Sequence, residues 1–310
     1  MEERWPRCDR WAGGPRPSRG GQLLVWPVER CAGASGGLRL MAESCFPSPE
    51  PLDQSDAVDA RYGAAALERE ACLCTPVGFD PALLQVIPDA VVERDYGCGD
   101  PTRWVRPGDR VLDLGSGSGK NAFICSQVVG ADGAVLGVDR NPDMLTLSRQ
   151  AAPVVAEAIG YGNVCFVEGA IEALDEQGDG AEPLVPDASI DVVLSNCVLN
   201  LVNPSSRQRL LANIRRVLAP GGRVAISDIV CDQPVPMHLQ QDPELWSGCI
   251  SGAWQEDDFL KDFRALGLEQ VTFADRSEQP WRTLEGIEFR AVTLVGQLPG
   301  QHSVVGAPCY

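Results

Sequence analysis

Histidine is nearly absent from this 310-residue chain, which contains only His238 and His302. A mechanism that needs a histidine general base therefore has almost nothing to draw on. The twelve cysteines form no close CxxC pair, and with so few histidines a structural zinc site is not expected. The cysteines are also scattered along the chain, unlike the framework of a secreted disulfide scaffold.

Basic residues are in short supply as well, since 26 Lys and Arg stand against 43 Asp and Glu and the net charge is −17. This charge argues against nucleic acid and against an anionic membrane surface as partners. Apolar runs are short, and none approaches the roughly twenty residues of a membrane-spanning helix. The amino terminus lacks the apolar core of a signal peptide. We therefore expect a cytoplasmic protein.

The composition changes along the chain and predicts its domain organisation. Residues 1–54 begin with a segment rich in Arg, Gly, Pro and Trp without sustained periodicity, which predicts a disordered amino-terminal extension. We expect residues 55–297 to form one domain, with residues 55–108 as an amino-terminal cap over its sheet. Residues 298–310 are expected to be a flexible tail.

The segment RVLDLGSGSG, residues 110–119, predicts a short apolar strand that runs into a glycine-rich turn. Gly115, Gly117 and Gly119 allow the backbone to turn sharply and to approach a ligand that any Cβ would keep away. A dinucleotide-binding enzyme can show a similar glycine pattern, so the turn by itself indicates only a nucleotide-like cofactor.

Two acidic residues favour S-adenosylmethionine as that cofactor. Asp113 lies inside the strand before the glycines, and Asp139 ends the next strand, AVLGVD. In a parallel sheet both carboxylates emerge at the carboxyl edge. There, one can face the amino-acid end of the cofactor and the other can accept hydrogen bonds from the ribose hydroxyls. The alternative is a turn that only reverses the chain, but the second acid arrives at the distance typical of a βαβ unit.

Strand patterns separated by helical patterns predict a parallel, doubly wound sheet of the α/β class. A final pair of strands is expected to be antiparallel at one edge, which distinguishes a methyltransferase sheet from a dehydrogenase sheet. The predicted architecture is thus a Rossmann-like, mostly parallel seven-stranded sheet with an antiparallel edge hairpin, the class I methyltransferase fold. Strands are expected at 110–114, 134–138, 164–168, 190–195, 223–228, 269–274 and 286–296, and helices from about 121 and at 142–158, 205–218 and 256–266.

Three cysteines occupy loops that can meet at the carboxyl edge of this sheet. Cys98 lies between two glycines before the first strand, Cys197 directly follows the fourth strand, and Cys249 lies in the loop WSGCISGAW. A residue just past a parallel strand stands beside the cofactor, and the two other loops are free to fold over that edge. The alternative for each thiol alone is a buried small hydrophobe.

Three thiolates near a methyl sulfonium would suit a soft, thiophilic acceptor. Trivalent arsenic bound by three sulfurs is pyramidal and keeps a lone pair, so it can attack a methyl carbon without loss of a proton. No general base is then needed, which fits a chain with two histidines. The protein has only to hold the lone pair within reach of the methyl group.

At these residues the chain resembles the arsenite methyltransferases, S-adenosylmethionine enzymes that methylate trivalent arsenic. The resemblance extends from about residue 57 to residue 295 and is carried by several dispersed motifs. They are YGCG at 96–99, LDLGSGSG at 112–119, GVD at 137–139, EGAIEAL at 168–174, SNCVLNLV at 195–202, LAPGG at 218–222, SDIV at 227–230 and DPELWSGCISGA at 242–253.

The resemblance implies that Cys98, Cys197 and Cys249 bind arsenic, and that Cys72 or Cys74 is an upstream cysteine that relays oxidation to the next thiol. Family members usually have an arginine and an aspartate after the glycine turn, where this chain has Lys120 and Asn121. The implied cofactor contacts are Gly115, Gly117, Asp139, Ala170, Ile171 and Asn196.

The first hypothesis is therefore an enzyme of arsenic detoxification that methylates arsenite, or its thiol conjugate, held by cysteine thiolates. It implies a thiol reductant such as thioredoxin or glutathione as a partner. A second hypothesis is a methyltransferase for another small acceptor, with the cysteines merely packed. A third is an arsenite-binding protein without turnover, which the departures at Lys120 and Asn121 keep open.

Overall fold

The computed structural model describes residues 54–67, 77–94, 96–176 and 182–300. The extension and the tail expected from the sequence lie almost wholly outside these ranges. The two candidate relay cysteines, Cys72 and Cys74, also lie outside the described residues.

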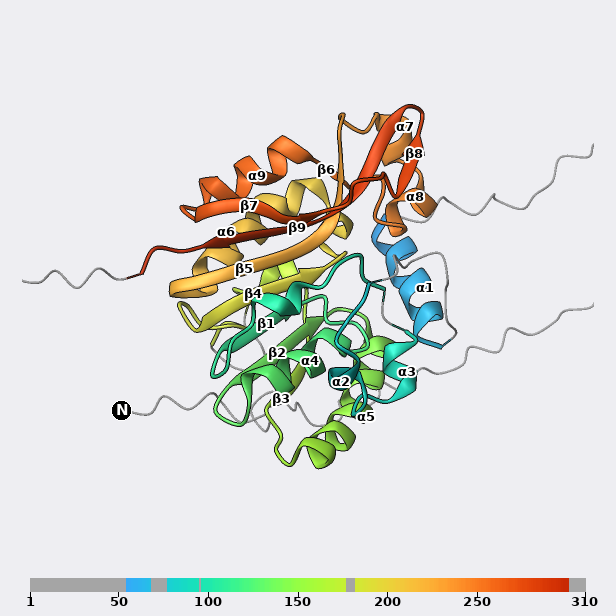
Figure 1. Ribbon diagram of the computed structural model, residues 1–310. Helices are drawn as coiled ribbons and strands as arrows, with labels where there is room; N and C mark the ends of the chain where they lie inside the picture. Colours follow the sequence, from blue (N-terminus) through green and yellow to red (C-terminus); the bar gives the residue numbers. More distant parts are fainter. Residues whose placement is uncertain (1–53, 68–76, 95, 177–181, 301–310) are drawn as a thin grey trace, which may run out of the picture.

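Helices and strands alternate through the described residues much as the sequence predicts (Figure 1). The strands are β1 (Arg110–Leu114), β2 (Ala134–Asp139), β3 (Val164–Glu168), β4 (Ile190–Asn196), β5 (Leu218–Cys231), β6 (Trp254–Gln255), β7 (Glu269–Arg276), β8 (Arg282–Leu284) and β9 (Ile287–Gln297). The α-helices are α1 (Gln54–Leu67), α2 (Pro81–Leu84), α3 (Asp89–Val92), α4 (Lys120–Val129), α5 (Pro142–Ile159), α6 (Arg207–Val217), α7 (Met237–Gln240), α8 (Pro243–Ser247) and α9 (Glu256–Ala265).

The sheet has the order β3-β2-β1-β4-β5-β9-β7 along its main path. The first five strands are parallel, and β9 is antiparallel to both of its neighbours, β5 and β7. The short strands β6 and β8 pair with the ends of β5 and β9. This order confirms the predicted mostly parallel sheet with an antiparallel pair at one edge.

The period-two pattern of the strands explains why helices cover both faces of the sheet. In β1, Leu112 and Leu114 pack with side chains of α6 and α9 in one core. Val111 points the other way and packs with α4 and α5 in a second core. Because both faces are covered, the central strands are apolar on both sides, as parallel sheets usually are.

The start of β5 differs from the sequence prediction. The sequence predicts a strand at 223–228, but β5 begins at Leu218, directly after α6. The pairing with β4 jumps from Leu218 to Arg223, so the intervening residues form an irregularity within the strand. Gly221 has φ +79°, which permits this local bend.

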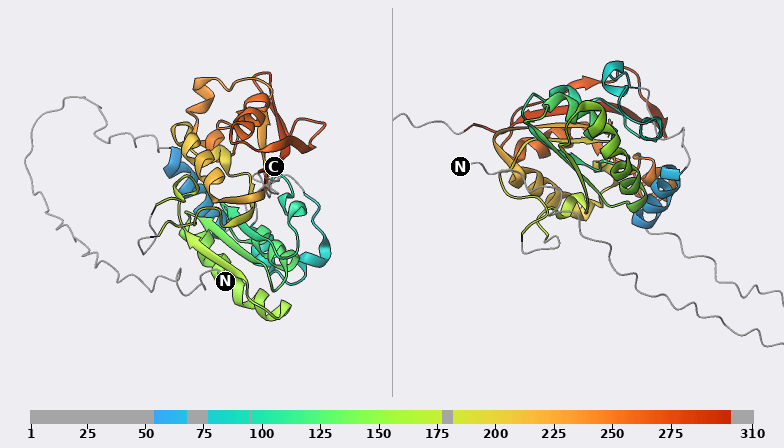
Figure 2. Two further views of the ribbon diagram at one scale, coloured as in Figure 1. Left: turned by 90° about the vertical axis from the view of Figure 1, so that its left-hand side faces the viewer. Right: turned by 90° about the horizontal axis from the view of Figure 1, so that it is seen from below.

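Helix α1 lies beside α8 and α5, two helices that are far from it in the sequence. Figures 1 and 2 show the blue helix against the orange segment that contains α8. Across the described ranges, no helix combines the length and the apolar content needed to cross a bilayer.

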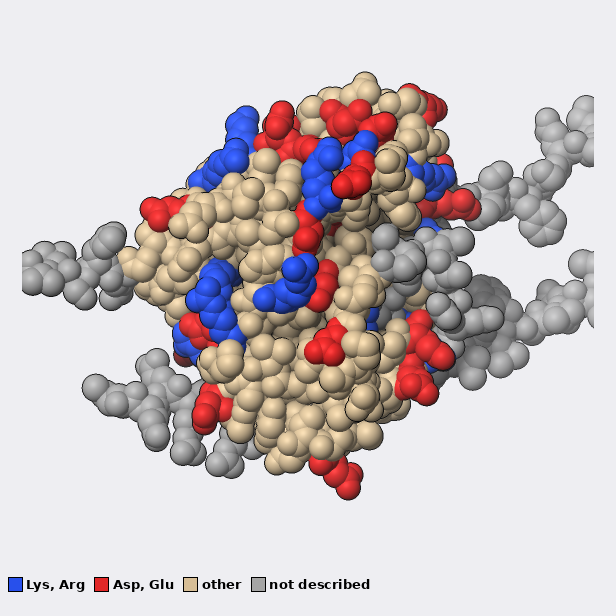
Figure 3. Space-filling view, in the orientation of Figure 1, with Lys and Arg blue, Asp and Glu red and all other residues tan. Residues whose placement is uncertain are grey.

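Charged side chains of both signs are interspersed on the face of the molecule drawn in Figure 3. Ion pairs such as Arg276–Glu256 (2.7 Å) and Arg103–Asp275 (3.0 Å) join charges from different elements. Neither sign of charge dominates the face drawn in Figure 3, although the whole chain carries a net charge of −17.

Candidate active site

A cleft lies at the carboxyl ends of the parallel strands, where α/β sheets bind their ligands. Its volume is about 1030 Å³ including the part open to solvent. The wall contains the glycine turn after β1, the loop after β2, Gly169 and Ile171 after β3, and Asn196 and Cys197 at the end of β4. Side chains from α1 close the cleft from the opposite side.

Asp139 is fixed at the end of β2 by two backbone hydrogen bonds. Its carboxylate accepts from the amide of Gly117 (2.7 Å) and from the amide of Asn141 (2.8 Å). Burial raises the pKa of Asp139, and these two hydrogen bonds oppose that rise. Gly115 has φ +68°, and a Cβ there would lie 2.5 Å from Val198. The turn and the carboxylate therefore form one pre-organised edge of the cleft.

The cofactor residues expected from the sequence divide into two groups. Gly115, Gly117, Asp139, Ile171 and Asn196 line the cleft. Three others are not part of its wall: Asp113, Gly119 and Ala170.

Asp113, whose carboxylate is expected to face the cofactor, is not among the residues of the cleft wall. Asp113 alternates with Leu112 and Leu114 along β1, so its side chain points to the side of the sheet covered by α4. There it raises the pKa of Cys125, on which burial has the larger effect. Its exposed fraction is 1%. Asp113 is therefore buried on that side of the sheet and does not form part of the cleft wall.

Sequence reasoning missed several residues of the cleft wall, among them Tyr62, Arg94, Tyr96, Met144 and Glu172. Two of them could have been found from the sequence, because Tyr96 belongs to the YGCG motif and Glu172 follows Ile171, an expected cofactor contact. Tyr62 could not, because its place in the cleft depends on where α1 docks.

The structure brings Cys98, Cys197 and Cys249 together from three separate loops. Cys98 and Cys197 form a disulfide, with their Cα atoms 6.0 Å apart. The Cys249 thiol donates to the carbonyl oxygen of Cys197 at 3.1 Å. All three are buried in one apolar cluster with residues such as Ile250 and Phe289. Cys197 also lines the cleft described above, so the sulfurs lie beside that cleft.

Two of the three cysteines are joined in a disulfide, whereas the sequence analysis expects three thiolates. Because Cys98 and Cys197 are joined to each other, only Cys249 of the three is a free thiol. Within the described part of the chain, no three His, Cys, Asp or Glu side chains are arranged to hold a metal ion. The Cα separation of the pair falls in the range that a disulfide bridges, which is why these two sulfurs can bond directly.

Cys197 and Cys249 also share an uncommon backbone conformation. Their φ angles are +59° and +61°, in the left-handed region that favours glycine. Backbone strain of this kind is found preferentially at functional sites, where the surrounding structure holds it in place. Here the Cys197 amide donates to Ser227 (2.8 Å) and the Cys249 amide donates to Trp246 (3.0 Å).

Asn196 holds the loop of Cys98 against the end of β4. Its Oδ1 accepts from the amides of Cys98 (2.9 Å) and Gly99 (3.2 Å), and its Nδ2 donates to the Gly99 oxygen (2.8 Å). A Cβ on Gly97 would overlap the Asn196 side chain. Asn196 was expected near the cofactor, and the structure gives it a second contact that fixes Cys98.

The loop of Cys249 rests on a second asparagine. Asn200 donates through Nδ2 to the carbonyl oxygens of Ile229 (2.7 Å) and Cys249 (3.2 Å). Burial raises the pKa of the Cys249 thiol, and the nearby Asp228 carboxyl adds to that rise. Burial also raises the pKa of Asp228 itself to about 7. Burial therefore disfavours the charged forms of both the Cys249 thiol and the Asp228 carboxyl group.

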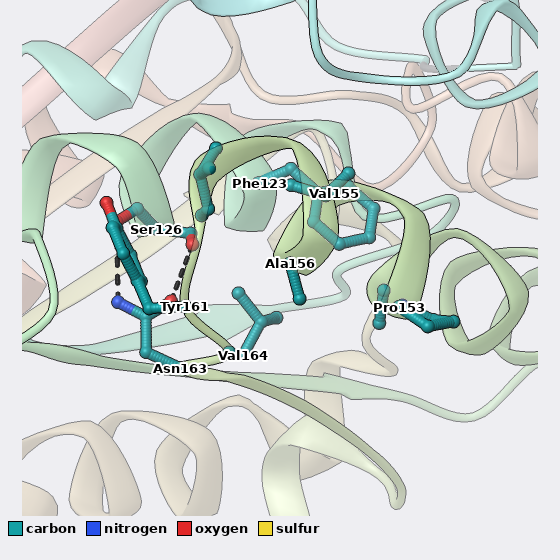
Figure 4. A pocket seen from close by; sticks show the side chains of 11 residues that line it. Phe123, Ser126, Pro153, Val155, Ala156, Tyr161, Asn163 and Val164 are labelled. Carbon is teal, nitrogen blue, oxygen red and sulfur yellow. Dashed lines mark hydrogen bonds between the residues drawn. The ribbon is translucent and has the colours of Figure 1, made fainter.

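A second cleft, between α4, α5 and the start of β3, lies at the opposite ends of the strands (Figure 4). Its polar groups bond to one another: Tyr161 donates to the Ser126 oxygen at 3.3 Å, and the Ser126 hydroxyl donates to Asn163 at 2.5 Å. None of the cysteines discussed above contributes to its wall.

Comparison with known proteins adds independent information. The family model described as a methyltransferase domain matches residues 106–267. The arsenite methyltransferase of Halobacterium salinarum is 39% identical over 219 residues, which cover 70% of this chain and 52% of that protein. The arsenite methyltransferase of Mus musculus is 35% identical over 231 residues, covering 72% and 59% respectively. The chain thus spans between half and three fifths of these relatives.

A solved structure supports the same assignment. The arsenic(III) S-adenosylmethionine methyltransferase of Chlamydomonas reinhardtii superimposes with a TM-score of 0.61 at 33% identity, covering 72% of this chain and 74% of that one. Fold, cleft and sequence agree, and S-adenosylmethionine is the cofactor that they indicate. The chain belongs to the arsenite methyltransferase family of class I methyltransferases.

Proposed function

We propose that this protein methylates trivalent arsenic that is held by the sulfurs of Cys98, Cys197 and Cys249. The observation that carries the proposal is the meeting of these three side chains in one buried cluster, beside the cofactor cleft. The names of the relatives support trivalent arsenic, such as arsenite, as the substrate.

The residues of the cleft fit S-adenosylmethionine. Asn121 Oδ1 and Ser116 Oγ are buried without a hydrogen-bond partner among the described residues, and both residues line the cleft. A ligand with amino and hydroxyl groups would satisfy such atoms. Asp139 would accept from the ribose hydroxyls, and Ile171 would pack against the adenine. When bound, the cofactor supplies a methyl group on a positively charged sulfur.

The cysteines would prepare the acceptor without a general base. Three thiols replace the three hydroxyl groups of arsenite and release three water molecules, so the arsenic keeps its lone pair. The apolar residues of the cluster, such as Ile250 and Phe289, would exclude water from the arsenic. The fixed positions of the Cys197 and Cys249 backbones would orient the lone pair toward the cleft.

The disulfide must open before three sulfurs can bind arsenic. Two thiols of a reductant such as thioredoxin or glutathione give up two electrons and two protons, become a disulfide, and leave Cys98 and Cys197 as thiols. We propose that Cys72 or Cys74 relays this exchange. The need for a reducing environment favours a cytoplasmic role in arsenic detoxification.

The test incubates purified protein with arsenite, a thiol reductant and S-adenosylmethionine labelled in the methyl group. We expect labelled methylarsenic from the native chain. Cys98→Ser, Cys197→Ser and Cys249→Ser should each abolish it. Each should leave cofactor affinity within about twofold, because the glycine turn and Asp139 keep their own hydrogen bonds.

Cys231→Ser is the matched control. Cys231 is a buried thiol of the same apolar cluster, and it donates to the Trp254 oxygen at 3.3 Å, which a serine hydroxyl can also do. This variant should keep its activity. Full activity of Cys197→Ser would contradict the thiol site, and arsenite binding without labelled product would point to a sequestering protein.

A further inference from the structure

Tyr62 of α1 touches both the cofactor cleft and the cysteine cluster. It lines the cleft, and its hydroxyl lies 3.8 Å from the sulfur of Cys249, 187 residues further along the chain. Its ring packs edge-on against Tyr96, another residue of the cleft wall, with centroids 6.2 Å apart and planes at 78°. One side chain therefore connects the two halves of the site.

The phenol of Tyr62 is the donor in its contact with Cys249. The thiol hydrogen of Cys249 is directed to the Cys197 carbonyl oxygen at 3.1 Å, so the hydroxyl group of Tyr62 donates to the sulfur. When arsenic replaces the thiol hydrogen, which leaves with an arsenite hydroxyl group as water, the sulfur still has lone pairs and the phenol can continue to donate to it.

Contacts toward both halves of the site hold α1 in place. Asp59 pairs with Arg140, which follows the cofactor acid Asp139, at 2.8 Å. Arg61 donates to the Glu244 oxygen and to the Ser247 hydroxyl, both at 3.1 Å, at the end of α8 that leads into the loop of Cys249. Tyr62 directly follows Arg61 on the same helix, so these attachments help to fix the position of its ring.

On the basis of the function proposed above, we propose that Tyr62 is a positioning residue that holds the Cys249 sulfur at the edge of the cofactor cleft. It acts through Cys249, because its hydroxyl group touches that sulfur. By restricting where the sulfur can lie, it restricts where a bound arsenic atom stands relative to the methyl donor.

Tyr62→Phe tests this role because it keeps the ring and removes only the hydroxyl group. We expect kcat for arsenic methylation to fall about fivefold, the effect of one lost hydrogen bond, while the KM for S-adenosylmethionine changes less than twofold. Tyr161→Phe is the matched control, because the Tyr161 hydroxyl donates to Ser126 in the distant cleft of Figure 4. It should match the native protein in both constants.

Tyr62→Leu removes the ring as well and should lower kcat further and raise the KM for S-adenosylmethionine, with circular dichroism as the check of folding. If Tyr62→Phe matches the native kcat, or changes only the KM for S-adenosylmethionine, the positioning role is overturned. If the native protein makes no methylarsenic, the proposed function itself fails, and this outcome is distinct from an active native protein with an unaffected Tyr62→Phe variant.

Discussion

Asp228 is a carboxyl group with no solvent exposure, close to the cysteine cluster. Burial raises its pKa from 3.8 to about 7, although the amides of Ile229 and Asn200 donate to it. In the unfolded chain the same group has its ordinary pKa. Between these two values the folded protein binds more protons than the unfolded protein, so stability must fall as pH rises.

We therefore predict that the free energy of unfolding of the native protein decreases between pH 4 and about pH 7 because Asp228 becomes charged while buried. In Asp228→Asn the part of this decrease that comes from Asp228 should disappear. The difference in the free energy of unfolding between the native protein and the variant should therefore change with pH over that range. Urea unfolding at a series of pH values measures it. If the free energies of unfolding of the two proteins change with pH in parallel, the pKa of Asp228 is not raised.

The loop between α8 and β6 carries Cys249 and is packed closely against the end of β4. A Cβ on Gly252 would overlap the backbone oxygen of Asn200, whose side chain holds Cys249. Since the obstacle is backbone, it cannot be relieved by a side-chain rotation. The position of the thiol thus depends on a whole loop that fits its neighbour, and a change in the fit is transmitted to the sulfur.

Gly252→Ala should accordingly destabilise the protein by about 1–3 kcal/mol and reduce arsenic methylation at least tenfold, because the loop must move away from Asn200. Gly78→Ala is the control, since a Cβ there meets nothing within 4 Å. Urea unfolding and the labelled methyl assay measure the two effects. Native activity in Gly252→Ala would show that the loop can shift without displacing Cys249.

The Cys98–Cys197 disulfide joins the segment before β1 to the end of β4 across 99 residues of sequence. A cross-link of that length restricts the unfolded chain by about 4–5 kcal/mol at room temperature. We predict that a thiol reductant lowers the free energy of unfolding by up to this amount, and that arsenite added to the reduced protein restores part of it by linking the same loops.

Thermal unfolding with and without reductant, and then with arsenite, measures these shifts. Cys197→Ser should lose most of the response to reductant and the response to arsenite. An equal arsenite shift in that variant would mean that arsenic binds elsewhere in the molecule.

The parallel sheet, the glycine turn and the acid Asp139 could be predicted from the sequence alone. Each depends on a pattern within one βαβ unit: the spacing of apolar residues, the absence of side chains at Gly115 and Gly117, and an acid at the end of the next strand. Such patterns are local, because strand and turn geometry are set by neighbouring residues. The burial of Asp113 outside the cleft wall could not be predicted in this way, because a strand side chain can face either side of a sheet that is buried on both.

Only the tertiary structure decided which sulfurs bond, where Cys249 lies and which side chain reaches it. Cys98 and Cys197 are 99 residues apart, and Tyr62 and Cys249 are 187 residues apart. Local periodicity and spacing do not predict contacts between residues so far apart in the sequence. Such contacts form only when α1, the loop before β1 and the loop after α8 dock on one edge of the sheet. The sequence by itself therefore determines the sheet and the edge formed by the glycine turn and Asp139, while the docking of these three segments determines how the three cysteines and Tyr62 lie relative to one another.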